Sequence, residues 1–214
     1  MEYALITGAT SGIGFELSVL YAQNGYGLVL VSSSKEHLEN TENRLNEQYS
    51  VPILIYEQDL TKQGAALELY NKIKQKKLDV TVLINNAGFG LVGATDEINL
   101  SIDEQMMMLN MINLVSLSKL IILDMYRNKK GKILNVSSTG AFQPGPYTST
   151  YFASKAFVLS YSRAIRYEAK ARGVQICILC PGATKTRLFL EEKVQLLQIK
   201  RCYLSRLPAS HLED

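Results

Sequence analysis

The chain has 214 residues, of which 47% are hydrophobic and 20% are charged, the proportions of an ordinary soluble globular protein with one well-buried core. The formal net charge is only +3, and the basic residues are scattered rather than interleaved with aromatic residues on one face, which excludes a nucleic-acid-binding surface. We therefore expect a single domain over residues 1–214 with no nucleic-acid partner.

Six short apolar runs rich in β-branched residues recur along the chain and are typical of strands. They cover residues 3–7, 28–31, 53–56, 80–84, 132–136 and 174–179. The segments between these runs carry apolar residues at helical spacing. We expect helices at residues 14–24, 36–48, 65–75, 102–127 and 152–171.

Strand and helix alternate along the chain, which predicts a parallel sheet because each parallel pair needs a crossover connection. Runs such as residues 28–31, apolar throughout, suit strands that are buried on both faces. The expected fold class is therefore a doubly wound α/β domain. After residue 186 the apolar spacing predicts one short helical tail within residues 187–214, with no further strand.

The chain has three cysteines, Cys177, Cys180 and Cys202, and an odd number in a chain of this size favours a reducing compartment over a disulfide scaffold. Cys177 and Cys180 fall in the run of residues 174–180, which is typical of a buried strand, and on a strand residues three apart point to opposite faces. We expect buried core cysteines rather than a redox pair. No signal peptide and no run of membrane-spanning length is expected, which predicts a cytoplasmic protein with no membrane partner.

A glycine-rich turn follows the first expected strand and leads directly into the first helix. Its glycines are Gly8, Gly12 and Gly14, which allow a tight turn and let the helix N-terminus face a pyrophosphate. Such a turn alone is weak evidence, since many are merely turns. Its position after strand one of an alternating α/β chain favours a dinucleotide cofactor.

The end of the second expected strand normally faces the adenosine ribose, where an acidic residue would bind the hydroxyls of NAD. Here Ser33, Ser34 and Lys35 follow the strand, and they offer hydrogen bonds and charge to a 2′-phosphate. NADP(H) is therefore favoured, with NAD(H) as the alternative. The serines also suit helix capping, and both roles are compatible. Asp59, after the third strand, accepts from the adenine amino group or caps the next helix.

Tyr151 and Lys155 stand four residues apart at the start of the last expected helix, so the phenol and the ammonium project from one face. Bringing a Tyr pKa from about 10 to about 7 needs roughly 4 kcal/mol of preferential phenolate stabilisation. A neighbouring ammonium and an oxidised nicotinamide ring would supply it. Tyr151 would then exchange a proton with a carbonyl or alcohol oxygen as hydride moves. The spacing alone is also common in pairs without chemistry.

Together these residues resemble the short-chain dehydrogenase/reductase family. The resemblance runs from about residue 2 to Thr186 and rests on several motifs in order. They are Thr7-Gly-x-x-x-Gly-x-Gly14, Asp59-Leu60, Asn85-Asn-Ala-Gly88, Ser138, Tyr151-x-x-x-Lys155 and Pro181-Gly182. Within the family the chain is similar to small bacterial NADP-dependent reductases that carry Asn-Asn-Ala-Gly-Phe-Gly, as residues 85–90 do. The resemblance to the family implies a Rossmann fold with strand order 3-2-1-4-5-6 and assembly as a homodimer or homotetramer.

The resemblance also implies a role for each matching residue. Tyr151 is the general acid or base, and Lys155 lowers its pKa and holds the nicotinamide ribose. Ser138, rather than its neighbour Ser137, donates a hydrogen bond to the substrate oxygen. In the family an Asn holds the water of a proton relay, and Asn110 matches that position. Its competitor Asn113 is then a packing or helix-face residue.

The cofactor contacts that the resemblance implies lie in six segments of the chain. They are Gly8, Thr10, Ser11, Gly12, Ile13, Gly14, Ser33, Ser34, Lys35, Asp59, Leu60, Asn86, Ala87, Gly88, Tyr151, Lys155, Pro181, Gly182, Thr184 and Thr186. Apolar Phe142, Pro144 and Phe189 indicate a lipophilic carbonyl or alcohol substrate, or ordinary packing. No metal is expected, and His37 and His211 fall on an expected surface helix and the tail, away from the chemistry.

Family members usually continue through a substrate lid, another helix and a seventh strand, whereas only residues 187–214 follow Thr186 here. We therefore expect the sheet to lack the usual last strand. Two functions follow from the sequence. The first is an NADP(H)-dependent oxidoreductase that interconverts a carbonyl and an alcohol. The second is a catalytically silent member of the family whose bound cofactor serves regulation or assembly.

Overall fold

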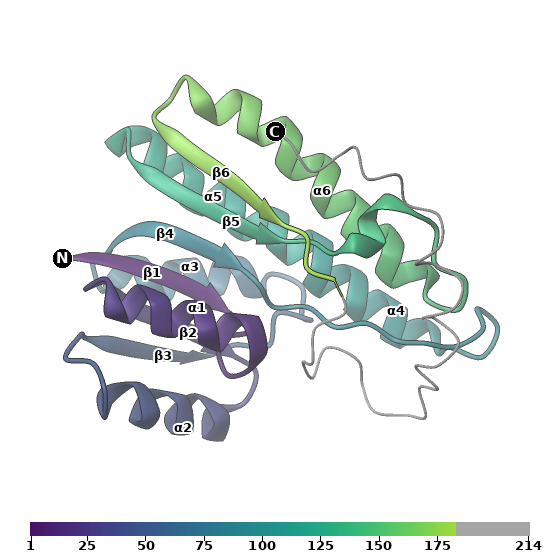
Figure 1. Ribbon diagram of the computed structural model, residues 1–214, viewed down its shortest axis with the longest axis horizontal. Coiled ribbons are helices and arrows are strands. Elements are labelled where there is room, and N and C mark those ends of the chain that lie inside the picture. Colours follow the sequence, from purple (N-terminus) through teal and green to yellow (C-terminus); the bar gives the residue numbers. More distant parts are fainter. Residues whose placement is uncertain (183–214) are drawn as a thin grey trace.

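The computed structural model describes residues 1–182 of the chain, and these form a six-stranded parallel sheet between helices (Figure 1). The strands are β1 (Glu2–Thr7), β2 (Gly27–Ser32), β3 (Ile53–Glu57), β4 (Asp79–Asn85), β5 (Gly131–Val136) and β6 (Val174–Leu179). The helices are α1 (Gly12–Gln23), α2 (Lys35–Asn46), α3 (Ala65–Gln75), α4 (Leu100–Met107), α5 (Leu114–Asn128) and α6 (Ser149–Lys170). A π-helical segment, η1 (Met108–Asn113), joins α4 to α5, and the short 3₁₀ helix η2 (Thr139–Phe142) follows β5.

The strand order is β3-β2-β1-β4-β5-β6, and every neighbouring pair is parallel. The predicted fold class and strand order are thus confirmed. Because all strands point the same way, their carboxyl ends meet at one edge of the sheet. The residues expected to bind cofactor and substrate follow those ends.

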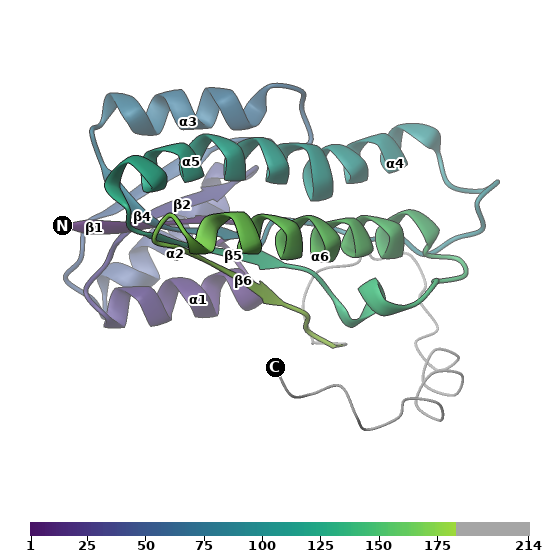
Figure 2. The ribbon, with the colours of Figure 1, turned by 90° about the horizontal axis from the view of Figure 1, so that it is seen from above.

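Helices cover both faces of the sheet, so alternate residues of the central strands are buried in different cores. Leu5 of β1 packs with α3 and α5 residues, whereas its neighbour Ile6 packs with residues of α1 and α2. Figure 2 shows α3 and α5 on one side of the sheet and α1 on the other. This burial on both faces explains why β2 is apolar almost throughout.

The prediction of buried core cysteines is wrong for the edge strand β6 and the residue after it. Cys177 is exposed and Cys180 is only half-buried, whereas both were expected in the core. Val174 and Ile176 of the same strand are buried among residues of α5 and α6. The other face of the sheet has its core over β1, β2 and β4, which leaves the alternate residues of β6 uncovered by that core. Cys202, the helical tail and any last strand lie outside the described residues.

The prediction that no run reaches membrane-spanning length is wrong for the long helix from α4 through α5. Leu100–Asn128 forms one helical stretch of 29 residues whose length and composition suffice to cross a membrane, so a run of that length does exist in the described chain. Its apolar side chains Leu117, Ile121 and Met125 are buried against the sheet. This is the packing of a core helix in an α/β domain.

Candidate active site

The glycine-rich turn between β1 and α1 is fastened to the end of β4. The Asn86 side-chain amide donates to the carbonyl oxygens of Thr7 and Gly8 at 3.1 and 3.0 Å. The Thr7 hydroxyl in turn accepts from the backbone N–H groups of Asn86 and Ala87 at 3.1 and 3.0 Å. Gly8 has a φ of +64°, which favours glycine. The turn is therefore held in one conformation at the carboxyl edge of the sheet.

The start of α1 fits the phosphates of a dinucleotide. Its N-cap residue, Ser11, makes no side-chain capping hydrogen bond, so that side chain does not satisfy the first backbone N–H groups of the helix. A Cβ on Gly14 would lie 2.1 Å from the Gly8 carbonyl oxygen, which leaves no room for a side chain beside the turn. Thr10, Gly12 and Ile13 share this turn. Close-packed backbone and open N–H groups are what a pyrophosphate requires.

Replacing Gly14 with alanine should displace the turn. The new Cβ would overlap the Gly8 carbonyl and lie 2.5 Å from the Asn86 amide nitrogen, so we expect a loss of about 1–3 kcal/mol in the free energy of unfolding. We also expect NADPH to bind at least roughly tenfold more weakly, because the phosphates and the turn no longer align. Urea unfolding and calorimetric titration measure the two effects.

Gly25→Ala is the matched control for Gly14→Ala. Gly25 has a φ of +77° and no atom within 4 Å of its Cβ position, so alanine strains the backbone by about 1–2 kcal/mol without touching the turn. We expect lower stability with unchanged NADPH affinity. Equal affinity losses in the two variants would show that general destabilisation, rather than the turn, weakens binding.

The three residues after β2 are close to the turn in the fold, and each has a local role. Ser34 is the N-cap of α2, and its hydroxyl accepts from the His37 backbone N–H at 3.3 Å. Lys35 forms an exposed ion pair with Glu39 at 3.6 Å. Ser33 is exposed. The capping role predicted for these serines is thus confirmed for Ser34, and the contacts of all three with a 2′-phosphate stay predictions.

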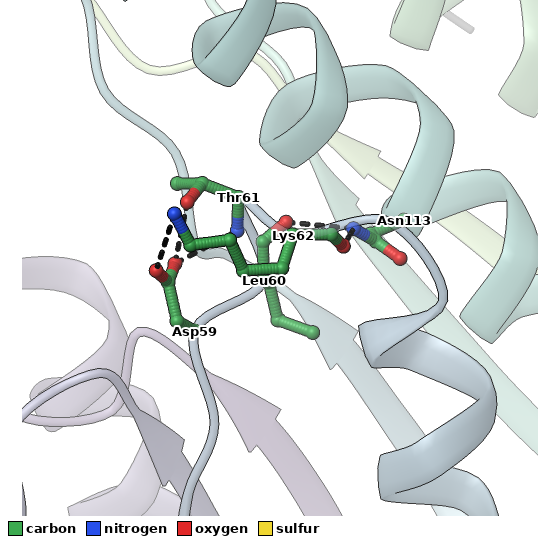
Figure 3. A network of polar contacts seen from close by, with 5 residues as sticks. All are labelled: Asp59, Leu60, Thr61, Lys62 and Asn113. Atoms are coloured by element: carbon green, nitrogen blue, oxygen red, sulfur yellow. Dashed lines mark hydrogen bonds and ion pairs between the residues drawn. The ribbon is translucent and has the colours of Figure 1, made fainter.

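The loop after β3 is organised by Asp59 and Asn113 (Figure 3). The Asp59 carboxylate accepts from the backbone N–H and hydroxyl of Thr61 at 2.9 and 2.7 Å. Burial favours a raised pKa for Asp59, but the Thr61 hydrogen bonds and nearby Lys62 outweigh it and hold the pKa below its usual value. Asp59 therefore caps its own loop rather than α3, whose N-cap is Gly64.

Asn113 holds the same loop from the other side. Its amide donates to the carbonyl oxygens of Leu60 and Lys62 at 2.7 and 2.9 Å and accepts from the Ala66 backbone N–H at 3.1 Å. Asn113 is thus a packing residue, as predicted. It fixes the loop that carries Asp59 and Leu60, two of the expected cofactor contacts.

Tyr151 and Lys155 face one site from the first turns of α6. Both are buried, with 3% of each residue exposed, and the Lys155 Nζ lies 5.6 Å from the Tyr151 ring centroid. The expected projection from one helical face is confirmed. The Lys155 Nζ also donates to the Val136 carbonyl oxygen at 3.0 Å, which ties α6 to the end of β5.

Burial shifts the pKa values of both groups toward their neutral forms. It raises the pKa of Tyr151 above 10, although a hydrogen bond with the Ser138 side chain opposes the rise. It lowers the pKa of Lys155 to about 8, although nearby Cys180 opposes this fall. Without other charges, the phenol is protonated at neutral pH and therefore able to donate a proton.

Ser138 and Ser137 make different contacts and therefore have different roles. Ser138 hydrogen-bonds with Tyr151, and its hydroxyl also accepts from the Gly140 backbone N–H at 3.1 Å. The Ser137 hydroxyl is buried and donates to the Lys155 carbonyl oxygen at 2.8 Å. Ser138 is thus beside the phenol, whereas Ser137 supports the backbone of α6.

Asn110 lies in the π-helical segment η1 and reaches the same site. Its amide oxygen accepts from the Phe89 backbone N–H at 3.3 Å, and its nitrogen donates to the Phe89 carbonyl and the Ser154 hydroxyl at 3.0 and 3.1 Å. A Cβ on Gly88 would lie 2.9 Å from the Asn110 Oδ1 and 3.4 Å from the Lys155 Nζ. Asn110 and Lys155 therefore converge over Gly88. Wide π turns of this kind often occur at functional sites.

A chain of buried amides and hydroxyls behind the site was not anticipated from the sequence. The Asn85 amide donates to Ser118 and to Asn135 at 2.9 and 2.8 Å, and the Asn135 amide donates to Ser162 at 2.8 Å. These bonds join β4 and β5 to α5 and α6. Polar residues inside otherwise apolar strands and helices are the signal that would have found them.

The segment after β6 begins beside Ser138. The Pro181 carbonyl oxygen accepts from the Thr139 backbone N–H at 3.0 Å, which places Pro181 and Gly182 at the same edge of the sheet as the other expected contacts. Thr184, Thr186 and Phe189 lie outside the described residues.

Comparison with known proteins finds dehydrogenases and reductases. A family model described as short chain dehydrogenase matches residues 2–195. Human 17-beta-hydroxysteroid dehydrogenase type 3 is 35% identical over 87% of this chain and 60% of its own length. The very-long-chain 3-oxoacyl-CoA reductase of Anas platyrhynchos is 31% identical over 87% of this chain and 61% of its own length. The chain thus spans about 60% of the length of these curated relatives.

Solved structures show the same architecture. The short-chain dehydrogenase from Sphingobium yanoikuyae in complex with NADPH has a TM-score of 0.83 and 30% identity, over 88% of this chain and 73% of that chain. The bulky-bulky ketone specific alcohol dehydrogenase from Comamonas testosteroni has a TM-score of 0.82 and 32% identity, over 86% of this chain and 73% of that chain.

Proposed function

The chain belongs to the short-chain dehydrogenase family, and from this premise we propose that it is an NADP(H)-dependent oxidoreductase that reduces a lipophilic ketone to an alcohol. One observation carries the proposal. Tyr151, Lys155, Ser138 and Asn110 come from three separate segments of the chain, yet they meet beside a glycine turn that fits dinucleotide phosphates. A protein that only binds the cofactor has no need of the buried Tyr and Lys pair.

In this proposal Tyr151 is the general acid. Burial raises the pKa of its phenol, so the proton is present at neutral pH and can pass to the substrate oxygen. Bound NADPH supplies the hydride that reaches the carbonyl carbon. Ser138, which contacts the Tyr151 side chain, donates a hydrogen bond to the same substrate oxygen and holds it within reach of the phenol.

Lys155 and Asn110 restore the proton to Tyr151. Lys155 has three N–H donors, one of which reaches the Val136 carbonyl oxygen, and the other two would bind the cofactor ribose and a relay water. Asn110, fixed by its bonds to Phe89 and Ser154, holds that water. The positive charge of Lys155 also favours the phenolate that remains after proton transfer.

The preference for NADP(H) rests on charge at the end of β2. Ser33, Ser34 and Lys35 place no carboxylate there, so nothing in this segment repels a 2′-phosphate. Two solved relatives support the same preference, since one is in complex with NADPH and another is complexed with 5-hydroxy-NADP.

The substrate class rests on apolar side chains beside the site and on the relatives. Phe142 and Tyr147, in the segment that joins Ser138 to Tyr151, are 60% and 66% exposed, and exposed aromatic rings favour an apolar ligand. The relatives are named for hydroxysteroids, very-long-chain 3-oxoacyl-CoA and bulky ketones. We therefore place the substrate among bulky lipophilic ketones.

A panel of carbonyl compounds tests the proposal. The full chain is incubated with NADPH and a ketosteroid, a long-chain 3-oxoacyl thioester, a small ketone or an aldehyde, and NADPH absorbance is followed. We expect the two bulky ketones to be reduced with the higher kcat/KM. Tight NADPH binding with no reduction of any compound would instead favour the catalytically silent member of the family, and the oxidoreductase proposal would be wrong.

A further inference from the structure

A pocket of about 190 Å³ lies between the glycine turn and α2, next to the site already described. It is lined by Thr10, Ser11, His37, Asn40, Thr41 and Arg44. This volume is far larger than a single water molecule needs. Every lining side chain is polar, and none is acidic. These side chains suit an anion with several oxygen atoms.

Arg44 is the strongest cation at this pocket. Its guanidinium lies 4.1 Å from the centroid of the Phe15 ring of α1, and stacking of this kind fixes its orientation. Within residues 1–182 it takes part in none of the ion pairs, which involve other lysines and arginines. A fixed guanidinium without a carboxylate partner is suited to bind a phosphate through two hydrogen bonds.

The other lining groups add donors around the same space. His37 is exposed on the first turn of α2, and its imidazole can donate an N–H. The Ser11 hydroxyl makes no capping bond to α1. The Thr41 hydroxyl, by contrast, already donates to the His37 carbonyl oxygen at 2.8 Å, which fixes the wall of the pocket.

We propose that Arg44 and His37, on α2, bind the 2′-phosphate of NADP(H) in this pocket and that they determine the preference for NADP(H) over NAD(H). The inference rests on the proposed cofactor. It places the selectivity on α2 rather than on the strand end, where Ser33 is uncharged, Ser34 caps α2 and the charge of Lys35 faces Glu39 at an exposed position. The end of β2 then only leaves room for the 2′-phosphate, and the side chains of α2 supply the positive charge that binds it.

Binding measurements on the full chain test this inference without any turnover. The probes are adenosine 2′,5′-bisphosphate, 5′-AMP, NADPH and NADH, titrated by calorimetry into the wild type, Arg44→Gln and His37→Gln. We expect Arg44→Gln to weaken the two ligands with a 2′-phosphate by roughly 10- to 100-fold, the range for hydrogen bonds to charged groups. His37→Gln should weaken them less, and 5′-AMP and NADH should bind each variant as they bind the wild type.

Two further variants separate this inference from its rivals. Arg127→Gln removes the same charge from the end of α5, where Arg127 pairs with Asp124, and it should leave all four affinities unchanged. Lys35→Gln tests the residue that the sequence favours. The inference is wrong if Arg44→Gln binds NADPH like the wild type, if it weakens NADH equally, or if only Lys35→Gln shows the loss. A wild type that prefers NADH would also overturn it while leaving carbonyl reduction intact.

Discussion

Tyr151→Phe should reduce turnover by roughly 10²- to 10⁴-fold, the usual contribution of a general acid or base. The substitution removes only the phenolic oxygen. The ring stays buried and the Lys155 Nζ keeps its bond to the Val136 carbonyl, so the site keeps its shape. Because the proposed role of Tyr151 is to act on the substrate oxygen, NADPH affinity should change little. Steady-state kinetics with the best ketone, together with NADPH titration, measures both quantities.

Tyr161→Phe is the matched control on the same helix. The Tyr161 phenol hydrogen-bonds with Ser118 of α5, and burial raises its pKa to about 12. Tyr161 lies about three helical turns beyond Tyr151 on α6, so its phenol stands outside the proposed proton transfer. Its removal should lower the free energy of unfolding by about 1 kcal/mol and leave kcat unchanged. If Tyr151→Phe kept wild-type turnover, the proton would have another donor, and the assigned role would fail.

Lys155→Met should abolish most turnover and stabilise the fold at neutral pH. Turnover falls because the charge beside Tyr151 and the proposed contact with the ribose are both lost. Stability rises because Lys155 is buried and its pKa is lowered to about 8, against about 10.4 in an unfolded chain. Near pH 7 the folded state therefore holds an unfavourably buried charge. Removing it should add on the order of 1–3 kcal/mol, reduced by the lost bond to Val136.

The pH dependence of stability shows whether Lys155→Met stabilises the fold by removing a buried charge or by better packing. Between the folded pKa of about 8 and the unfolded value of about 10.4, the unfolded wild type binds a proton that the folded state does not. Wild-type stability should therefore rise with pH in this window, and the advantage of Lys155→Met should shrink. Lys119→Met, at an exposed position of α5, should show no such trend. A constant difference between Lys155→Met and the wild type from pH 7 to pH 10 would contradict the account.

The strands and most helices could be predicted from periodicity because their burial is regular. The α3 range of Ala65–Gln75 and the β6 range of Val174–Leu179 match the expected residues. The interruption of the long helix by η1 was not predicted. Apolar spacing continues through this segment, and the π turn depends on the tertiary contacts of Asn110 and Asn113, which no local pattern contains.

The physical difference between neighbouring candidate residues is visible only in the structure. Ser137 and Ser138 have the same side chain, and only their positions relative to α6 show that one supports the Lys155 backbone while the other contacts Tyr151. Asn110 and Asn113 differ in the same way, since one reaches Ser154 and the other the loop after β3. In each pair the family spacing favoured the residue that the structure places at the site.

Other features depend on which surfaces meet in three dimensions. Cys177 has the sequence context of a core residue, but the sheet edge leaves it exposed. His37 and Arg44 read as ordinary residues of a surface helix. Only the packing of α2 beside the glycine turn brings them to a shared pocket with Thr10 and Ser11.

Transfer of deuterium from labelled cofactor tests the central claim most directly. NADPH that carries deuterium at the transferable position of its nicotinamide ring is incubated with the full chain and a bulky lipophilic ketone, and the alcohol is analysed by mass spectrometry. The account predicts an alcohol with deuterium on the former carbonyl carbon in the wild type and a strongly reduced yield in Tyr151→Phe. Bound NADPH with no labelled alcohol, or equal yields from the two proteins, would contradict it.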